Sequence, residues 1–176
     1  MINWEWNEAD ILEKNQQWNE ARTYIYTKWM ENQLDLKVTI RLGFLCWYIL
    51  VEWDCINSEG VNQEKFENSL KEVTQFGLMN FSEEIEFLWI FGYMISMFPY
   101  YFGDYEEMEQ LGIEMLRKAH HLDTSDSIVK MVYLGHNYNE NPKEYEKSCK
   151  MSKLLIVDRF KGEGILAEYF REVLNR

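Results

Sequence analysis

Residues 34–56 read LDLKVTIRLGFLCWYILVEWDCI and carry the clearest helical pattern of the chain. Apolar side chains recur along this segment at steps of three and four, at Leu34, Val38, Leu42, Leu45, Ile49, Trp53 and Ile56. Because an α-helix has a period of about 3.6 residues, this spacing places all of them on one face. The pattern predicts a long helix over residues 34–56 whose apolar face lies in the core.

The same periodicity extends in both directions from this helix, and no segment alternates as a β-strand does over more than a few residues. Two prolines and nine glycines in 176 residues favour long helices over many short strands. The expected helices cover about residues 7–29, with or without a break at 15–17, and then 34–56, 62–76, 82–98, 104–122, 126–132, 142–160 and 163–173. Gly77 is expected to end the third of these. We predict one all-α domain over residues 1–176, with about eight helices stacked as antiparallel hairpins or packed as an irregular bundle.

Residues 87–103 form the longest uncharged segment, of 17 residues, between two acidic positions. A membrane-spanning helix needs about 17–25 apolar residues, so the segment only reaches the lower limit. It also contains Gly92, Ser96 and Pro99, and its flanks lack the basic residues that follow many membrane helices. We therefore expect a buried core helix here and no transmembrane segment.

The three cysteines and residues 1–8 indicate the cellular compartment of the protein. Cys46, Cys55 and Cys149 are odd in number, far apart and never in a C-x-x-C pair, which is typical of reduced thiols. Residues 1–8 contain neither a basic region nor an apolar run of the kind found in a secretory signal. These features predict a cytoplasmic protein.

No segment carries a convincing catalytic or cofactor-binding motif. Residues 162–167, GEGILA, lie four residues after the apolar run 154–157, whereas a dinucleotide-binding turn follows its strand directly. The adjacent His120 and His121 would point about 100° apart on a helix and could not share one metal ion. A G-x-S-x-G nucleophile motif is absent from the sequence. We expect no enzymatic activity, no bound metal and no cofactor.

The distribution of charge stands out against this background. The formal net charge is −12, and residues 52–126 hold sixteen acids but only four bases. Between Lys71 and Arg117 there are nine acids and no Lys, Arg or His. Such a stretch lacks, within itself, the stabilising pairs of opposite charge that helix surfaces usually contain. It would repel nucleic acid and anionic lipid and attract a basic partner, or it would serve only to keep an aromatic-rich protein in solution.

One part of the chain resembles a tetratricopeptide repeat, the two-helix unit of many protein-binding solenoids. The resemblance lies in Phe91-Gly92 on a first helix, in residues 103–107, GDYEE, at the start of a second, and in Ala119 and Leu122-Asp123 near its end. The second helix is about one turn too long for the repeat, and Thr124 stands where a proline is usual. The resemblance implies stacked helical hairpins of this general kind.

The profile of the whole chain, acidic, helical and without catalytic motifs, resembles the immunity proteins of bacterial contact-dependent growth inhibition and related polymorphic toxin systems. That resemblance implies an inhibitor that binds a basic toxin domain, commonly a nuclease, and blocks its active site or substrate groove. We expect a basic protein partner, no nucleic acid and no membrane. The expected partner-binding residues combine aromatic anchors with carboxylates near Pro99 and are Tyr100, Tyr101, Phe102, Asp104, Tyr105, Glu106, Glu107 and Glu109.

Two further hypotheses remain open from the sequence. Trp4 and Trp6 offer a second possible contact surface, unless they pack onto the core. The alternative function is that of a regulatory scaffold, similar to tetratricopeptide proteins, that binds a short peptide in a concave groove.

Overall fold

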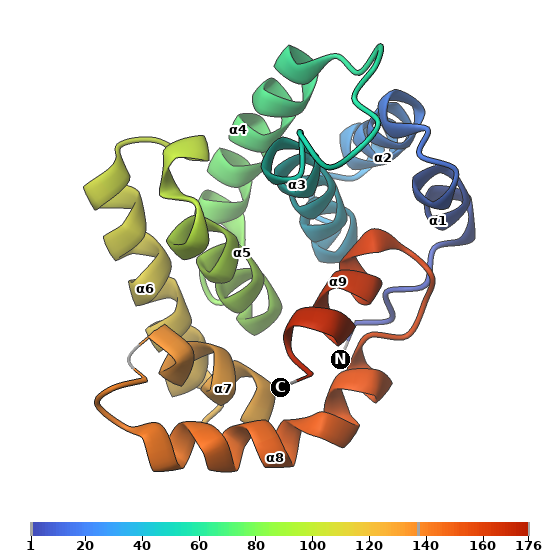
Figure 1. Cartoon of the computed structure of the whole chain (residues 1–176). Helices are drawn as coiled ribbons and strands as arrows, with labels where there is room; N and C mark the ends of the chain where they lie inside the picture. Colours follow the sequence, from blue (N-terminus) through green and yellow to red (C-terminus); the bar gives the residue numbers. More distant parts are fainter. Residues whose placement is uncertain (1, 137, 176) are drawn as a thin grey trace.

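The computed structural model describes residues 2–136 and 138–175, and Figure 1 shows helices joined by loops, of which residues 52–62 between α3 and α4 form a long one. The elements are α1 Asn7–Lys14, α2 Trp18–Glu31, α3 Leu36–Val51, α4 Gln63–Asn80, α5 Ile85–Met97, the 3-10 helix η1 Pro99–Tyr101, α6 Tyr105–Leu122, α7 Ser127–His136, α8 Pro142–Arg159 and α9 Ile165–Val173. The described residues contain no β-strand. The prediction of an all-α fold is confirmed.

Local interactions set several helix ends. The carboxylate of Asp35 accepts a hydrogen bond from the Val38 amide at 3.1 Å and caps α3. The side chain of Asn62 caps α4 in the same way. The first predicted helix breaks into α1 and α2, since Gln16 has a φ of 55° in the left-handed region, which ends a right-handed helix.

The expected end of a helix at Gly77 is wrong, because α4 continues to Asn80. A Cβ atom at position 77 would collide with the ring of Phe87, so glycine serves helix packing here. Helix α3 also ends earlier than predicted, at Val51. Helix α5 lies in the core as expected, with the side chains of Phe87 to Ile95 mostly buried. None of the described helices combines the length and the apolar character needed to cross a membrane.

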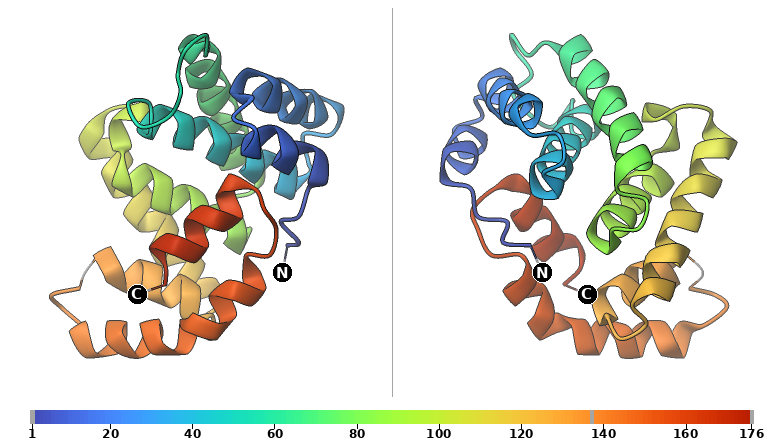
Figure 2. Two further views of the ribbon diagram at one scale, coloured as in Figure 1. Left: turned by 45° about the vertical axis from the view of Figure 1, so that its right-hand side comes forward. Right: turned by 180° about the vertical axis from the view of Figure 1, so that it is seen from behind.

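The helices follow one another around a curved path, and α9 returns to its inner side (Figures 1 and 2). Helices α3 and α4, α5 and α6, and α7 and α8 form contacting pairs, whereas α9 contacts α1, α3 and α8. The ring of Phe170 on α9 lies 4.9 Å from Trp89, 5.1 Å from Phe160 and 5.4 Å from Phe44. Aromatic pairs at this spacing add to the stabilisation from burial. Helix α9 thus occupies the part of the inner side that faces α1, α3 and α8.

Helices α5 and α6 make the most extensive helix–helix contact. Gly92 and Gly112 face each other across it, and a Cβ atom at Gly112 would lie 2.6 Å from the Ser96 nitrogen. The two backbones approach closely because neither position carries a side chain. This contact holds the first turns of α6 beside the C-terminal end of α5.

Two buried arginines join distant segments. Arg41 on α3 contacts Asp10 and Glu13 on α1, each at 2.8 Å, and donates to the Trp4 carbonyl at 2.9 Å. Arg159 on α8 pairs with Glu86 at 2.7 Å and with Asp126 at 2.6 Å. A buried ion pair is costly to break because a charge is then left without a partner. These arginines therefore fix α1 against α3, and α8 against the N-terminal ends of α5 and α7.

Candidate functional site

The candidate site begins where η1 meets α6. Pro99 occupies the first turn of η1, and Asp104 caps α6 by accepting hydrogen bonds from the amides of Glu106 at 3.1 Å and Glu107 at 3.2 Å. Carboxylates in the first turn of a helix are favoured by the positive end of its dipole. The local sequence thus stabilises a helix start that carries several negative charges.

The four aromatic residues of this region have different surroundings. The hydroxyl of Tyr101 donates a hydrogen bond to the Leu50 carbonyl at 2.6 Å, and burial raises the pKa of Tyr101 to about 12. Phe102 is half-buried against the core. Tyr100 and Tyr105, in contrast, remain 57% and 53% exposed. Tyr101 and Phe102 therefore anchor the segment, whereas Tyr100 and Tyr105 face solvent.

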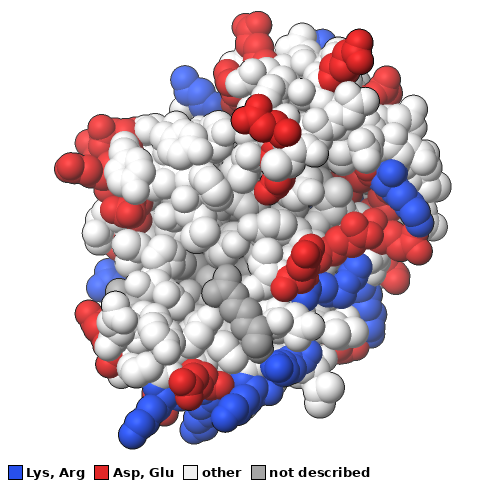
Figure 3. Space-filling view, in the orientation of Figure 1, with Lys and Arg blue, Asp and Glu red and all other residues white. Residues whose placement is uncertain are grey.

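The carboxylates at this end of α6 carry uncompensated charge. Asp104, Glu106 and Glu107 are exposed, Glu109 is half-buried, and none of the four makes an ion pair with a described base. Glu109 accepts a long hydrogen bond of 3.5 Å from Tyr105. We call these four carboxylates, with Tyr100 and Tyr105, the acidic end of α6. Figure 3 shows acidic side chains gathered there, at the upper left of the view.

The basic-free stretch predicted from the sequence is not one uniform face. Glu83 pairs with Lys118, and Glu86 pairs with Arg159. Both carboxylates lie at the N-terminal end of α5, and the 13 residues of α5 separate them from η1 by about 20 Å at 1.5 Å per residue. Of the seven carboxylates of the stretch that make no ion pair with a described base, four lie at the acidic end of α6 and three, Glu72, Glu84 and Glu114, lie elsewhere.

A pocket of about 250 Å³ lies beside this end and was not predicted from the sequence. It is lined by Tyr93, Met97, Met131, Val132, Gly135, His136, Tyr145 and Leu174. Met97, at the end of α5, is 49% exposed and stands two residues before Pro99. The lining comes from four separate segments, so periodicity within one helix gives no sign of it. Apolar walls with few polar groups are typical of sites that accept an apolar side chain or a small ligand.

His136 is the histidine of the pocket wall. Its Nε2 atom lies 2.7 Å from the Ser96 hydroxyl, which in turn donates to the Tyr93 carbonyl. Burial lowers the pKa of His136, and the negative charge of Glu109 acts in the opposite direction. Glu109, at the acidic end of α6, is thus the charged group that acts on His136.

The other candidates from the sequence lie elsewhere. Trp4 is 1% exposed and belongs to the core, and Trp6 is half-buried against Tyr24 at a ring distance of 5.7 Å. Trp4 therefore offers no contact surface. His120 stacks on Tyr133 at 5.3 Å, and within the described residues no three His, Cys, Asp or Glu side chains converge as metal ligands.

The sequence matches no protein-family model and no curated protein, and no solved structure matches the fold.

Proposed function

We propose that this chain is an acidic inhibitor that binds a basic protein, and specifically an immunity protein that neutralises a basic toxin domain of the nuclease type. One observation carries the proposal most directly. The acidic end of α6 presents four carboxylates without a basic partner in the described residues, next to two tyrosines that are more than half exposed. Aromatic anchors among charges are typical of protein interfaces.

The electrostatics favour a basic partner. A surface with uncompensated negative charge speeds the approach of a positively charged protein and opposes nucleic acid. A nuclease groove is basic because it binds phosphates, so the carboxylates would occupy the positions of substrate phosphates or cover the groove. The pocket at Met97 and His136 would take an apolar side chain from the rim of the same partner.

The alternative function, a scaffold that binds a peptide in a concave groove, has less support. In such a scaffold the inner side of the helical curve is open to the ligand. Here α9 occupies the inner side and packs against α1, α3 and α8. A peptide could reach the part of that surface beneath α9 only after Phe170 had left the aromatic cluster around Trp89.

The test uses the product of the gene next to the one that encodes this chain. If a large secreted toxin is encoded there, its C-terminal domain should form a one-to-one complex with this protein and lose its nuclease activity. A catalytically dead toxin domain should bind equally well, which separates binding from inhibition. A toxin domain that retains full activity in a saturating excess of this protein would contradict the proposal.

A further inference from the structure

The outer face of α8 differs in charge from the rest of the molecule. Lys143, Lys147, Lys150, Leu154 and Val157 follow each other at steps of four, three, four and three, which places them in one row along the helix. All five side chains are exposed. The opposite face is buried and consists of Ser148, Cys149, Ser152, Ile156 and Arg159.

The lysines of this face lack carboxylate partners. Lys143, Lys147, Lys150 and the neighbouring Lys153 make no ion pair with any acid in the described residues. The chain has 30 acids and 18 bases, so carboxylates are not scarce. Helix α8 carries five bases and the three acids Glu144, Glu146 and Asp158, so its net charge is positive and opposite in sign to that of the whole chain.

The same helix exposes more apolar surface than a solvated helix needs. Leu154 is 86% exposed and Val157 62%, and Met151 and Leu155 flank them at 56% and 50%. Contiguous exposed apolar side chains mark surfaces that contact protein or membrane. Lysine stems can lie along an apolar surface while the ammonium group stays in water, so the two kinds of side chain suit one interface.

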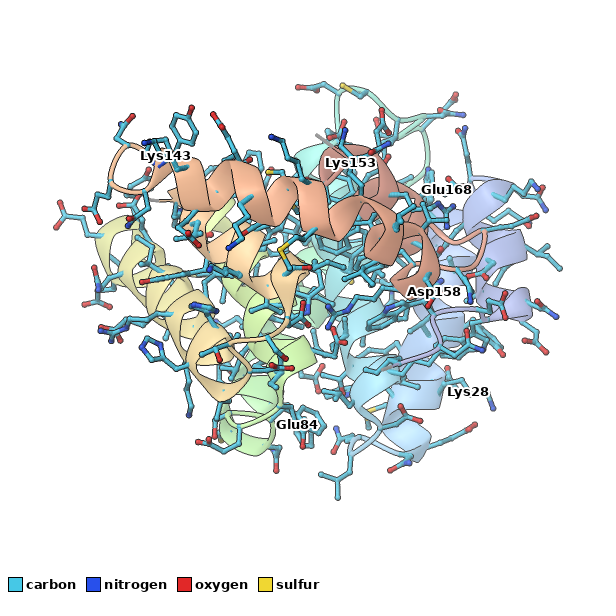
Figure 4. All side chains as sticks on the ribbon, turned by 90° about the horizontal axis from the view of Figure 1, so that it is seen from below. Lys28, Glu84, Lys143, Lys153, Asp158 and Glu168 are labelled. Carbon is cyan, nitrogen blue, oxygen red and sulfur yellow. The ribbon has the colours of Figure 1, made fainter. Side chains whose placement is uncertain are left out.

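The position of α8 decides which kind of partner fits. Helix α8 lies along the lower edge of the molecule, where Figure 3 shows the basic side chains, away from the acidic end of α6. Seen from below in Figure 4, it crosses this side of the molecule from Lys143 past Lys153 to Asp158. All five side chains of the row are exposed on this helix. A flat anionic surface can meet such an exposed helix face without a complementary cavity.

We propose that α8 docks this protein on the surface of an anionic lipid bilayer. The lysines contact headgroup phosphates, and Leu154 and Val157 enter the boundary between headgroups and acyl chains. Glu146 and Asp158 on α8 itself reduce the attraction, whereas carboxylates farther away than the Debye length, about 8 Å at physiological salt, oppose the contact little. The expectation of no membrane partner rested on the charge of residues 52–126, which do not include α8.

The test is sedimentation of the whole protein with vesicles. The wild-type protein should bind vesicles of equal parts phosphatidylglycerol and phosphatidylcholine, and at least tenfold more weakly those of phosphatidylcholine alone. The double variant Lys147→Gln/Lys150→Gln should weaken binding to the anionic vesicles about tenfold or more. Leu154→Ser/Val157→Ser should weaken it severalfold at unchanged net charge.

Lys65→Gln/Lys71→Gln on α4 is the matched control. Both lysines are exposed and without an ion pair in the described residues, and the double variant changes the net charge by the same amount. Circular dichroism of each variant checks the fold. An equal loss in this control, or no loss from Leu154→Ser/Val157→Ser, would overturn the proposal. Failure of the wild-type protein to bind anionic vesicles would also overturn the proposal. The exposed face of α8 would then be assigned to contact with a protein partner instead.

Discussion

The Nη2 atom of Arg41 lies 2.8 Å from the Oε1 atom of Glu13, and only 1% of either side chain is exposed. Asp10 contacts the same guanidinium group, and Glu13 also accepts a hydrogen bond from the Ile165 amide at 2.9 Å. One buried cation thus holds α1, α3 and the start of α9 together.

Replacing Arg41 with Met should lower the free energy of unfolding by about 3–5 kcal/mol, because two buried carboxylates lose their counter-charge. Urea unfolding followed by tryptophan fluorescence measures the change. Lys28→Met removes an exposed pair with Glu31 and should cost less than about 1 kcal/mol. Similar losses of unfolding free energy in both variants would show that the burial of the Arg41 ion pairs does not cause the larger expected loss.

Reversing Glu106, Glu107 and Glu109 to Lys should slow association with a basic toxin domain and reduce the dependence of the association rate on salt, because these carboxylates supply the attracting field. Asp104 is kept, since its loss would remove the cap of α6 at a cost of about 1 kcal/mol. Stopped-flow measurement at two ionic strengths gives both quantities.

The control reverses Glu140, Glu168 and Glu172, which are exposed and also lack an ion pair in the described part of the chain. It changes the net charge equally and should slow association much less. Equal effects of the two triple variants would mean that only total charge governs binding.

Substitutions of Tyr100 and Tyr101 should have different effects, the first on binding and the second on stability. Tyr101→Phe loses the hydrogen bond to the Leu50 carbonyl and should destabilise the fold by about 1 kcal/mol. Tyr100→Ala should leave stability nearly unchanged but weaken the complex by about 1–2 kcal/mol, as expected for an exposed aromatic anchor. Thermal unfolding and calorimetric titration give the two values, and full affinity in Tyr100→Ala would remove this tyrosine from the interface.

Gly112→Ala should destabilise the protein by about 1–3 kcal/mol, because the added methyl group meets the backbone of Ser96 at 2.6 Å. Gly103→Ala adds the same group next to the flexible Met108 side chain at 3.3 Å and should cost much less. Chemical unfolding compares them. Equal stability of the two variants would contradict the close approach of α5 and α6.

Stability should fall as the pH decreases below about 6.5, in part because of His136. Burial lowers the pKa of His136 in the folded state, so the unfolded chain binds its proton at a higher pH. The stabilisation from this residue is therefore complete above the unfolded pKa and is lost as the pH falls toward the folded one. His136→Asn should show a smaller decrease in unfolding free energy between pH 7.5 and 5.5 than the wild-type protein, and an unchanged decrease would exclude His136 as a contributor.

The sequence predicted those features that depend on neighbours along the chain. The apolar stripe from Val38 to Ile49 marked α3, and the charged start of α6 was recognised together with Asp104. It could not show that Tyr101 bonds to Leu50, 51 residues away, since that contact depends on how the helices pack. The pocket and the ion pairs of Glu83 and Glu86 were missed for the same reason.

The return of α9 has a consequence for the way this chain folds during synthesis. Ile165 meets Glu13 across 152 residues, and Phe170 completes an aromatic cluster whose other members come from α3, α5 and the end of α8. Until α9 has left the ribosome, that cluster stays open and Glu13 lacks one of its donors. The native packing of this cluster can therefore form only after translation of nearly all of these residues, and until then Phe44, Trp89 and Phe160 lack a shared aromatic neighbour.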